Sequence, residues 1–468
     1  MQLGNNIRSI LLIFLATALC SCGIDTSNTH VSTKSWTHPT DLTSDAISPA
    51  GQSSNALQVA MDDNGNAIIV WFQSHNVYLS EFRSEKWIHP DTLADTFNPE
   101  DTGAISPAVG MTNDGRAIVS WSQYDGSRGQ IYKSEYFDNN WLYPSSLDDH
   151  INPNAQIWAD SVRVATGNND AIIIWEQFDG QNYQIYKSEF RDGNWIHPPS
   201  LSDHVSPAGQ DTYFFSQQVA MDANGNTIIV WTQRTGTGWE IFKSEYRNGT
   251  WSHPSSLSDN ISFDGHQALF PQVAMGDNGD AIIVWQQNTS DGIQIFKSEY
   301  RNNTWSHPTS FSDSISPLYY SGDWAFNPQV AMNAEGTAII CWQQCDSSDS
   351  SRNIYKSEYH DGLWNHPADL SEKISPDGGL AEYPQVALDN NNNAIIVWNQ
   401  SNGLNSQVFK SEFRDGRWLN PSSINDNISP NGQSAILPEV AMSNNGNAII
   451  VWQQSDGAQD QVFMSEYR

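Results

Sequence analysis

The sequence predicts an all-β protein: a single eight-bladed β-propeller of four-stranded antiparallel blades. Three observations lead to this fold. A segment resembling QVAMDDNGNAIIVW recurs along the whole chain. The repeat unit is about 50 residues long, the size of a propeller blade made of short strands. The two ends of the chain carry complementary pieces of one repeat, so a closed ring accounts for both.

Two series of tryptophans fix the number of repeats at eight. Neighbouring members of the first series lie 50 to 57 residues apart. The first series comprises Trp71, Trp121, Trp175, Trp231, Trp285, Trp342, Trp398 and Trp452. The second series, in W-x-H-P segments and their variants, comprises Trp36, Trp87, Trp141, Trp195, Trp251, Trp305, Trp364 and Trp418.

Each repeat contains four runs typical of strands, as residues 272–311 illustrate. QVAMG is the first run, and Asn278-Gly279 after it indicates a two-residue hairpin turn. AIIVWQQ is nearly all apolar, so we expect both of its faces to be covered. QIFKSEYR is the third run. WSHPTSF is the fourth, and Pro308 places it at a sheet edge because proline lacks a backbone donor.

The ends of the chain predict how the ring closes. A lone fourth run, WTHPTDL, begins at Trp36, and the last repeat stops at Arg468 without a fourth run. We therefore expect residues 36–42 to complete the last blade. Closure removes the exposed sheet edges that an open array would leave.

The N-terminus predicts export and lipid attachment. An apolar stretch follows Arg8 and ends in Leu19-Cys20-Ser21-Cys22, which resembles the cleavage box of bacterial lipoproteins. We therefore expect residues 1–21 to be a signal peptide, Cys22 to carry the lipid, 22–35 to be a linker and 36–468 to be the propeller. Ordinary signal cleavage without a lipid is the alternative. The expected location is the bacterial cell envelope, as an outer-membrane lipoprotein facing the periplasm or the cell surface.

Composition excludes some partners. The formal net charge of −31 would repel a phosphate backbone, so we expect no nucleic-acid partner. We expect a monomer with no cofactor and no metal. The hairpin loops, such as Asp62-Asp63-Asn64-Gly65-Asn66, carry oxygen ligands, but the residues at these positions change from blade to blade while the demand for a turn does not.

The repeats resemble those of bacterial secreted β-propeller proteins and, more distantly, sialidase-type Asp-box and propeller-lectin repeats. The resemblance is one of architecture over nearly the whole mature chain. It departs from the Asp-box, because Gly65 precedes Trp71 by six residues and no Ser or Thr leads the motif. Sialidases also need a cluster of three arginines. The repeat arginines here lie on separate blades, so sialidase activity is not implied.

A residue present in every blade is explained by blade geometry, whereas a single active site needs residues that break the pattern. The repeat tryptophans, the Lys-x-Glu pairs of the third run and the six histidines before proline are therefore interpreted as structural. The residues that break the pattern gather in the variable loops of one face. These candidate ligand-binding residues are Trp158, Tyr213, Phe214, Phe215, Trp239, Phe270, Tyr319, Tyr320, Trp324 and Phe326.

Exposed aromatic side chains on variable loops over a rigid scaffold are typical of a recognition surface. The sequence therefore favours a non-catalytic envelope protein that binds a glycan, peptide or protein through this face. In one alternative, the long loops bury their own aromatics. Others are a multivalent lectin with one site per blade, an envelope scaffold, and a glycosidase or lyase acting at the central channel. Such an enzyme would need carboxylates that break the pattern, and Asp160 and Asp323 are candidates.

Overall fold

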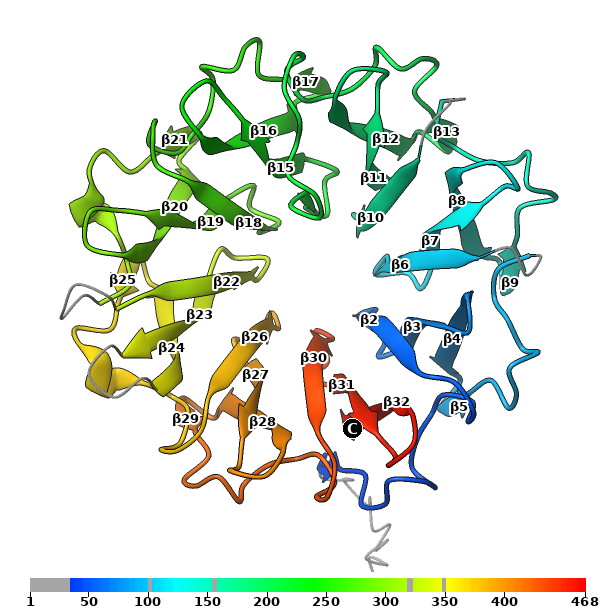
Figure 1. The fold of residues 1–468 in the computed structure, drawn as a ribbon, viewed down its shortest axis with the longest axis vertical. Coiled ribbons are helices and arrows are strands. Elements are labelled where there is room, and N and C mark those ends of the chain that lie inside the picture. Colours follow the sequence, from blue (N-terminus) through cyan, green and yellow to red (C-terminus); the bar gives the residue numbers. More distant parts are fainter. Residues whose placement is uncertain (1–33, 100–102, 154–157, 318–322, 347–350) are drawn as a thin grey trace, which may run out of the picture. The chain divides into compact units, whose positions relative to one another are not determined.

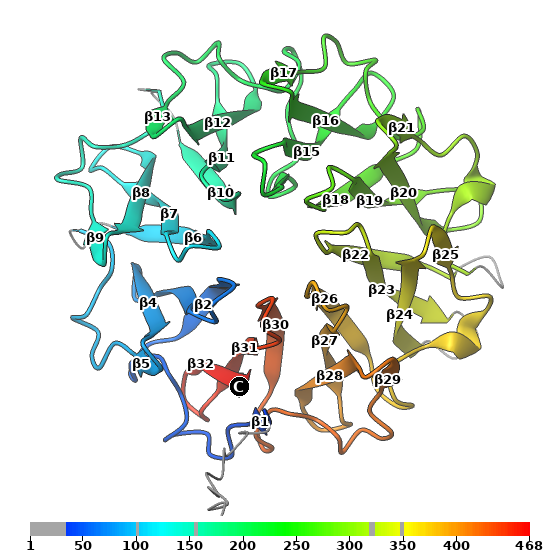
Figure 2. The same cartoon turned by 180° about the vertical axis from the view of Figure 1, so that it is seen from behind.

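The computed structural model describes residues 34–99, 103–153, 158–317, 323–346 and 351–468. Trp36–Arg468 forms one compact unit. It contains eight four-stranded antiparallel sheets arranged as the blades of a ring, as Figure 1 shows from one end and Figure 2 from the other. The predicted eight-bladed β-propeller is confirmed. No helix of the described residues is long and apolar enough to cross a membrane.

In seven blades the strands run outward in chain order, and in the eighth the outermost strand is β1. The innermost strands are β2 (Ser54–Met61), β6 (Ala104–Met111), β10 (Ala159–Thr166), β14 (Gln218–Met221), β18 (Ala268–Met275), β22 (Ala325–Met332), β26 (Ala381–Leu388) and β30 (Ala435–Met442). The second strands are β3 (Ala67–Gln73), β7 (Ala117–Tyr124), β11 (Ala171–Phe178), β15 (Thr227–Arg234), β19 (Ala281–Asn288), β23 (Ala338–Asp346), β27 (Ala394–Ser401) and β31 (Ala448–Ser455).

The outer half of each blade is built in the same way. The third strands are β4 (Asn76–Arg83), β8 (Gly129–Phe137), β12 (Tyr183–Arg191), β16 (Trp239–Arg247), β20 (Ile293–Arg301), β24 (Ser351–His360), β28 (Ser406–Arg414) and β32 (Asp460–Tyr467). The outermost strands are β5 (Lys86–Ile88), β9 (Asn140–Leu142), β13 (Asn194–Ile196), β17 (Thr250–Ser252), β21 (Thr304–Ser306), β25 (Leu363–Asn365), β29 (Arg417–Leu419) and β1 (Trp36–Thr37). Two short 3-10 helices, η1 (Phe311–Asp313) and η2 (Leu370–Glu372), follow β21 and β25.

We number the blades 1 to 8 from β2–β5 onward, so that blade 8 is β30-β31-β32-β1. We call the end of the ring that carries the first-to-second and third-to-fourth turns the turn face. The opposite end, with the second-to-third and blade-to-blade connections, is the loop face.

The core lies between the blades, as the apolar second runs predict. Every second-strand tryptophan is fully buried. In every blade its indole nitrogen donates to the glutamine two residues later, as from Trp71 to Gln73 at 3.0 Å, so a large apolar side chain is buried without losing its polar partner. Core clusters then join the second strand of one blade to the first and second strands of the next.

A repeated clasp holds the outer edges of neighbouring blades together. The outer-strand tryptophan of one blade donates to the third-strand glutamate of the preceding blade, as from Trp305 to Glu245 at 3.0 Å. A lysine two residues before that glutamate lies over the same indole ring, with the Lys243 nitrogen 4.7 Å from the Trp305 centroid. The structural interpretation of the repeat Trp, Glu and Lys residues is therefore confirmed.

The ring closes where the sequence predicts it. Trp36 pairs with Tyr467 and Thr37 with Glu466, so β1 completes blade 8. Trp36 then takes its place in the clasp and donates to Glu412 of blade 7 at 2.9 Å. On the other side of the junction, Trp87 of blade 1 donates to Glu466 at 3.1 Å.

Two local predictions are wrong. The connection at Asn278-Gly279 is a five-residue loop over 276–280, in which the Gly279 N–H donates to the Gly276 carbonyl, and is not a two-residue hairpin. The outermost strands are also shorter than expected: β21 ends at Ser306, two residues before Pro308. The proline lies beyond the strand because it has no N–H group to give to the ladder.

Candidate functional site

One position of the innermost strand is occupied by different residues in different blades. It lies opposite the fourth residue of the second strand, for example Gln272 opposite Val284. The eight occupants are Gln58, Ala108, Arg163, Gln218, Gln272, Gln329, Gln385 and Glu439. Five are glutamines, and only Arg163 and Glu439 carry a charge.

A pocket of about 170 Å³ opens at this position on the loop-face side of blades 5 to 8; we call it the axial pocket. Its lining includes Gln272, Gln329, Gln385 and Glu439, so it lies against the innermost strands that ring the centre in Figure 1. Its rim carries Phe270, Tyr383 and Leu437, each at a β-bulge and each with a positive φ of 51° to 54°. The same bulge recurs in every innermost strand except β14, so it belongs to the blade geometry, and only the side chains that it carries differ.

Glu439 is the ionisable group of the axial pocket. Burial raises the pKa of Glu439 from 4.5 to about 8, although the charge of Arg163 and a hydrogen bond from Gln385 both oppose the rise. The Gln385 amide donates to Oε1 at 3.0 Å. The residue as a whole is partly buried and lines the pocket. Glu439 is therefore a largely protonated carboxyl group at neutral pH that a ligand in the pocket could reach.

The charges of both Glu439 and Asp160 act on Arg163. Its guanidinium donates to the Val162 carbonyl at 2.9 Å, and burial lowers its pKa while the charges of Glu439 and Asp160 raise it. Asp160 lies opposite Glu176 in the β10–β11 ladder. Burial raises the pKa of Glu176 to about 7, and the charges of Asp160 and Asp211 add to the rise.

The junction of blades 3 and 4 is where the repeat itself breaks. The innermost strand β14 has four residues, whereas its counterparts have eight. The segment before it runs over 212–217, where Thr212 donates to Glu176 and Gln217 donates to the Ser161 carbonyl. Four of the nine buried side-chain atoms without a hydrogen-bond partner among the described residues lie here: Ser161 Oγ, Glu176 Oε2, Gln217 Oε1 and Thr232 Oγ1.

The expected aromatic surface forms separate clusters. Tyr213 packs edge-on against Trp239 and Phe270, at centroid distances of 5.1 and 5.9 Å. Phe214 and Phe215 contact each other and are exposed. The remaining residues lie on other blades, and Tyr319 and Tyr320 lie outside the described residues.

The other aromatic candidates are partly covered. Trp158 stacks on Tyr124, and a side chain at Gly129 would lie 2.7 Å from its indole ring. Trp324 packs in the same way against Gly292 and contacts Phe326. The structure therefore brings only Phe270, of the aromatic candidates, to the rim of the axial pocket.

The two carboxylates that the sequence suggests for an enzyme, Asp160 and Asp323, have different surroundings. Asp160 accepts a hydrogen bond from the Ser161 N–H at 2.6 Å and belongs to the group formed with Arg163 and Glu176. Asp323 is fully buried beside Trp324 and remote in sequence from that group. Among the described residues, no group of three or more His, Cys, Asp or Glu side chains could hold a metal ion.

Sequence reasoning missed Arg163, Glu176 and Glu439. The signal was present in the residue before the repeated Val-Ala, which reads Gln in most blades but Arg in RVAT and Glu in EVAM. A single changed residue at this strand position is less conspicuous than the aromatic residues of the long loops.

The chain matches no protein-family model and no curated protein. Among solved structures it is similar to an ulvan lyase described as a new family of polysaccharide lyase, PL25, with a TM-score of 0.47, 9% identity and coverage of 90% of this chain and 94% of that one. It is also similar to the polysaccharide lyase Uly1 (TM-score 0.46, 10% identity, 82% and 94% coverage). A third is the GH93 α-L-arabinofuranosidase of Fusarium graminearum (TM-score 0.36, 12% identity, 68% and 95% coverage).

At these identities the likeness is one of fold. The three proteins are nevertheless described as enzymes that act on glycans, which contradicts our expectation of a non-catalytic binding protein; that expectation is withdrawn. The distant resemblance to Asp-box repeats finds no support at the level of sequence families. The chain is thus an eight-bladed β-propeller whose solved structural neighbours include polysaccharide lyases and an arabinofuranosidase.

Proposed function

We propose that the protein is a glycan-cleaving enzyme and that Glu439 in the axial pocket is its proton donor. The observation that carries this proposal is a carboxyl group with a pKa of about 8 at the one axial position that reads Glu, in a pocket open to solvent. A glycosidic bond breaks when its leaving oxygen receives a proton, and a carboxyl group with a raised pKa is the usual donor in glycosidases.

The surroundings of Glu439 suit this role at each stage. Before the transfer, burial keeps the proton on the carboxyl group. After the transfer, the positive charge of Arg163 stabilises the carboxylate that remains. The Gln385 amide, which donates to Oε1, fixes the orientation of the carboxyl group. The neighbouring Gln272 and Gln329 provide donors and acceptors for sugar hydroxyl groups in the same pocket.

The test is a screen for cleavage of soluble polysaccharides, followed by the Glu439→Gln variant. New reducing ends report any cleavage, and ultraviolet absorbance of an unsaturated product distinguishes elimination from hydrolysis. We expect Glu439→Gln to lower kcat by about 10² or more, because general acid catalysis contributes 10²–10⁴.

Glu240→Gln is the matched control. Burial raises the pKa of Glu240 to about 7, but its blade-3 counterpart is Gln184, which accepts the same hydrogen bond from a serine. The control should therefore keep full activity. Equal activity of the wild type and Glu439→Gln would refute the proposed role.

We further infer that the protein is a lipoprotein of the bacterial envelope, with lipid on Cys22 and no nucleic-acid partner. The support is the Leu19-Cys20-Ser21-Cys22 sequence after an apolar stretch and the net charge of −31. Metabolic labelling with palmitate should mark the wild type and not Cys22→Ser. Equal labelling of both chains would exclude this acceptor.

A further inference from the structure

An arginine at the end of the third strand fills the space between two neighbouring blades on the turn face, and this arrangement recurs around the ring. We call the space that it fills an arginine slot. The arginines are Arg83, Arg191, Arg247, Arg301 and Arg414, each the last residue of its strand, and Arg468, which follows β32.

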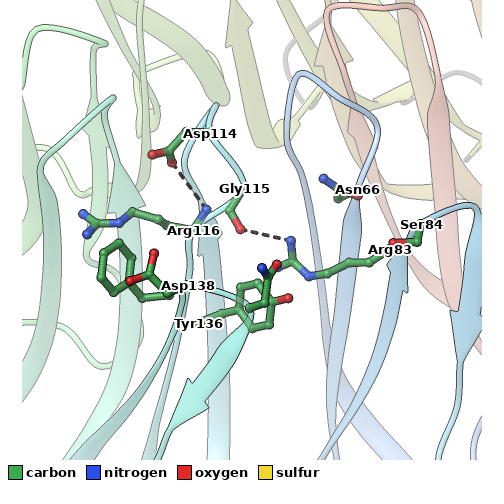
Figure 3. A pocket seen from close by; sticks show the side chains of 10 residues that line it. Asn66, Arg83, Ser84, Asp114, Gly115, Arg116, Tyr136 and Asp138 are labelled. Atoms are coloured by element: carbon green, nitrogen blue, oxygen red, sulfur yellow. Dashed lines mark hydrogen bonds between the residues drawn. The ribbon is translucent and has the colours of Figure 1, made fainter.

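Three contacts hold the arginine in each slot. Its Nε pairs with the glutamate two residues earlier, as Arg191 does with Glu189 at 3.2 Å. A terminal nitrogen donates to a backbone carbonyl in the turn of the next blade, as from Arg83 to Gly115 at 3.0 Å in Figure 3. The guanidinium lies over an aromatic ring of that blade, which for Arg83 is Tyr136 at a centroid distance of 3.8 Å. The other slots repeat these contacts.

Blades 2 and 6 lack this arginine, because Phe137 and His360 stand at its position. Between blades 2 and 3 a pocket of about 210 Å³ opens on the turn face. Its lining includes Glu135, Asn169 and Phe190, which are the counterparts of the three residues that contact the arginine in the other slots. The chain therefore provides the contacts of an arginine slot here without an arginine of its own. We call this pocket the blade 2–3 slot.

The contact groups of the blade 2–3 slot are open to solvent. Glu135 Oε1 accepts from Lys133 and from Trp195, which leaves Oε2 without a hydrogen bond among the described residues. The buried partnerless atoms of the described residues do not include this Oε2, and the Glu135 side chain is 25% exposed. Asn169 is exposed and Phe190 is partly buried. A ligand in the pocket therefore has access to the groups that an arginine uses elsewhere in the ring.

Arg116 lies beside the blade 2–3 slot but does not make its contacts. Figure 3 shows its side chain directed away from Arg83. Its guanidinium lies 4.0 Å from the Phe137 centroid and 5.7 Å from the Phe190 centroid. Within the part of the chain that the structure describes, Glu135 pairs with Lys133 and not with Arg116. Arg116 thus leaves Oε2 of this carboxylate to a second cation, although as a like charge it weakens the binding of that cation.

Charge and shape both favour a guanidinium group in this slot. The formal net charge of −31 attracts a basic partner. A guanidinium is planar, donates in several directions and stacks on an aromatic ring, whereas an ammonium group is a compact point charge. The chain itself makes this distinction: its third-strand lysines lie over the outer tryptophans, as Lys133 does over Trp195 at 4.6 Å, and its arginines fill the slots.

We propose that the blade 2–3 slot is a docking site for an arginine side chain of a basic polypeptide partner. The partner's guanidinium binds Glu135 Oε2 and the backbone carbonyl of Asn169 and stacks on Phe190, as the chain's own arginines do in the other slots. The docking site is separate from the axial pocket and does not depend on the proposed function.

The test is an NMR titration of the full chain with the blocked tripeptide acetyl-Ala-Arg-Ala-amide. The reporter is the indole N–H signal of Trp195, which donates to Glu135 at 2.8 Å. We expect the tripeptide to shift this signal with one equivalent bound per chain. The lysine tripeptide should bind more weakly, because it lacks the planar fork of donors, and the glutamate tripeptide should not bind.

Two variants give blade 2 residues that blade 1 already has at the equivalent positions. Arg116→Asn with Phe137→Arg should fold normally, fill the slot with an arginine of the chain itself and abolish binding. Arg116→Asn alone should strengthen binding, because it removes a like charge. His360→Arg is the matched control: it restores the arginine of blade 6 and should leave the titration at Trp195 unchanged.

Glu135→Gln should weaken binding about tenfold or more, as expected for loss of a hydrogen bond to a charged group. Glu439→Gln should bind like the wild type, since Glu439 does not line the slot, so that loss of docking and loss of activity are measured separately.

An unchanged Trp195 signal with the arginine tripeptide would overturn the proposal, as would equal binding of the lysine or glutamate tripeptide. Weaker binding in Arg116→Asn, or wild-type binding in the double variant, would also overturn it. Self-association of the wild type that the double variant abolishes would assign the slot to a second copy of the chain instead.

Discussion

At the scale of single residues, the same side chain has different consequences in different surroundings. The repeat histidines are held by a serine hydroxyl and stacked on tryptophan, as His253 is on Trp251, and burial lowers their pKa values. They stay neutral and serve the blade edge. Glu439 is also shifted toward its neutral form, but in a pocket that solvent reaches, where a proton can be used.

Glu439 should make the stability of the protein fall as the pH rises. Its pKa is about 8 in the folded chain and near 4.5 when unfolded, so the folded state binds the proton more tightly. The favourable contribution is complete below pH 4.5 and is lost progressively up to about pH 8. The free energy of unfolding of Glu439→Gln relative to wild type should therefore rise by about 1–3 kcal/mol across this window.

Urea denaturation of the wild type and Glu439→Gln at pH 4, 6, 8 and 9 measures the difference between their free energies of unfolding. The contributions of the other titrating groups cancel in this difference. Activity, which needs the protonated carboxyl group, should decline above about pH 8 in the same wild-type protein. A difference in stability that does not change with pH would mean that the Glu439 pKa is not raised.

At the scale of elements, alternation and turn residues predict the strands well but not their irregularities. The buried run AIIVWQQ becomes β19 as expected, because apolar residues on both faces leave it only a central position. The bulge at Phe270 is not predicted, because no glycine or asparagine marks the residue that takes the positive φ. The short length of β14 is not predicted either, because the residues Tyr213-Phe214-Phe215 before it have ordinary strand propensity.

The candidate site is likewise only partly predictable from the sequence. Aromatic residues in variable loops are conspicuous in the sequence, yet of those in the described part of the chain only Phe270 reaches the axial pocket. Arg163 and Glu439 stand 276 positions apart, and their charges interact because the ring places their equivalent positions around one axis. Only the blade register reveals such a pair, because no local spacing links them.

At the scale of the whole molecule, stability depends on whether each blade has a neighbour on both sides. Seven blades are made from continuous chain, and blade 8 alone recruits its outermost strand from the other end. That strand, β1, has two residues and is held by pairing to β32 and by the clasp at Trp36. The junction of blades 8 and 1 is therefore the place where the ring can open without cutting the chain.

Trp36→Ala should consequently destabilise the protein more than Trp305→Ala. The two side chains make matched contacts: each donates to a glutamate of the preceding blade, lies 4.7 Å from a lysine nitrogen and stacks on a histidine. Loss of the local contacts should cost about 2–4 kcal/mol in both variants. Trp36→Ala additionally releases β1, which exposes the edge of β32 and the flank of blade 1.

Thermal unfolding and amide hydrogen exchange at β32 (Asp460–Tyr467) distinguish the two variants. Exchange at the edge of β32 should accelerate in Trp36→Ala and remain slow in Trp305→Ala, because β20 keeps its partner β21 by chain connection. Equal losses of stability together with unchanged exchange at β32 would show that the two-residue β1 does not hold the ring closed, and that the core between blades 8 and 1, where Trp71 packs against Ile449 and Val451, suffices.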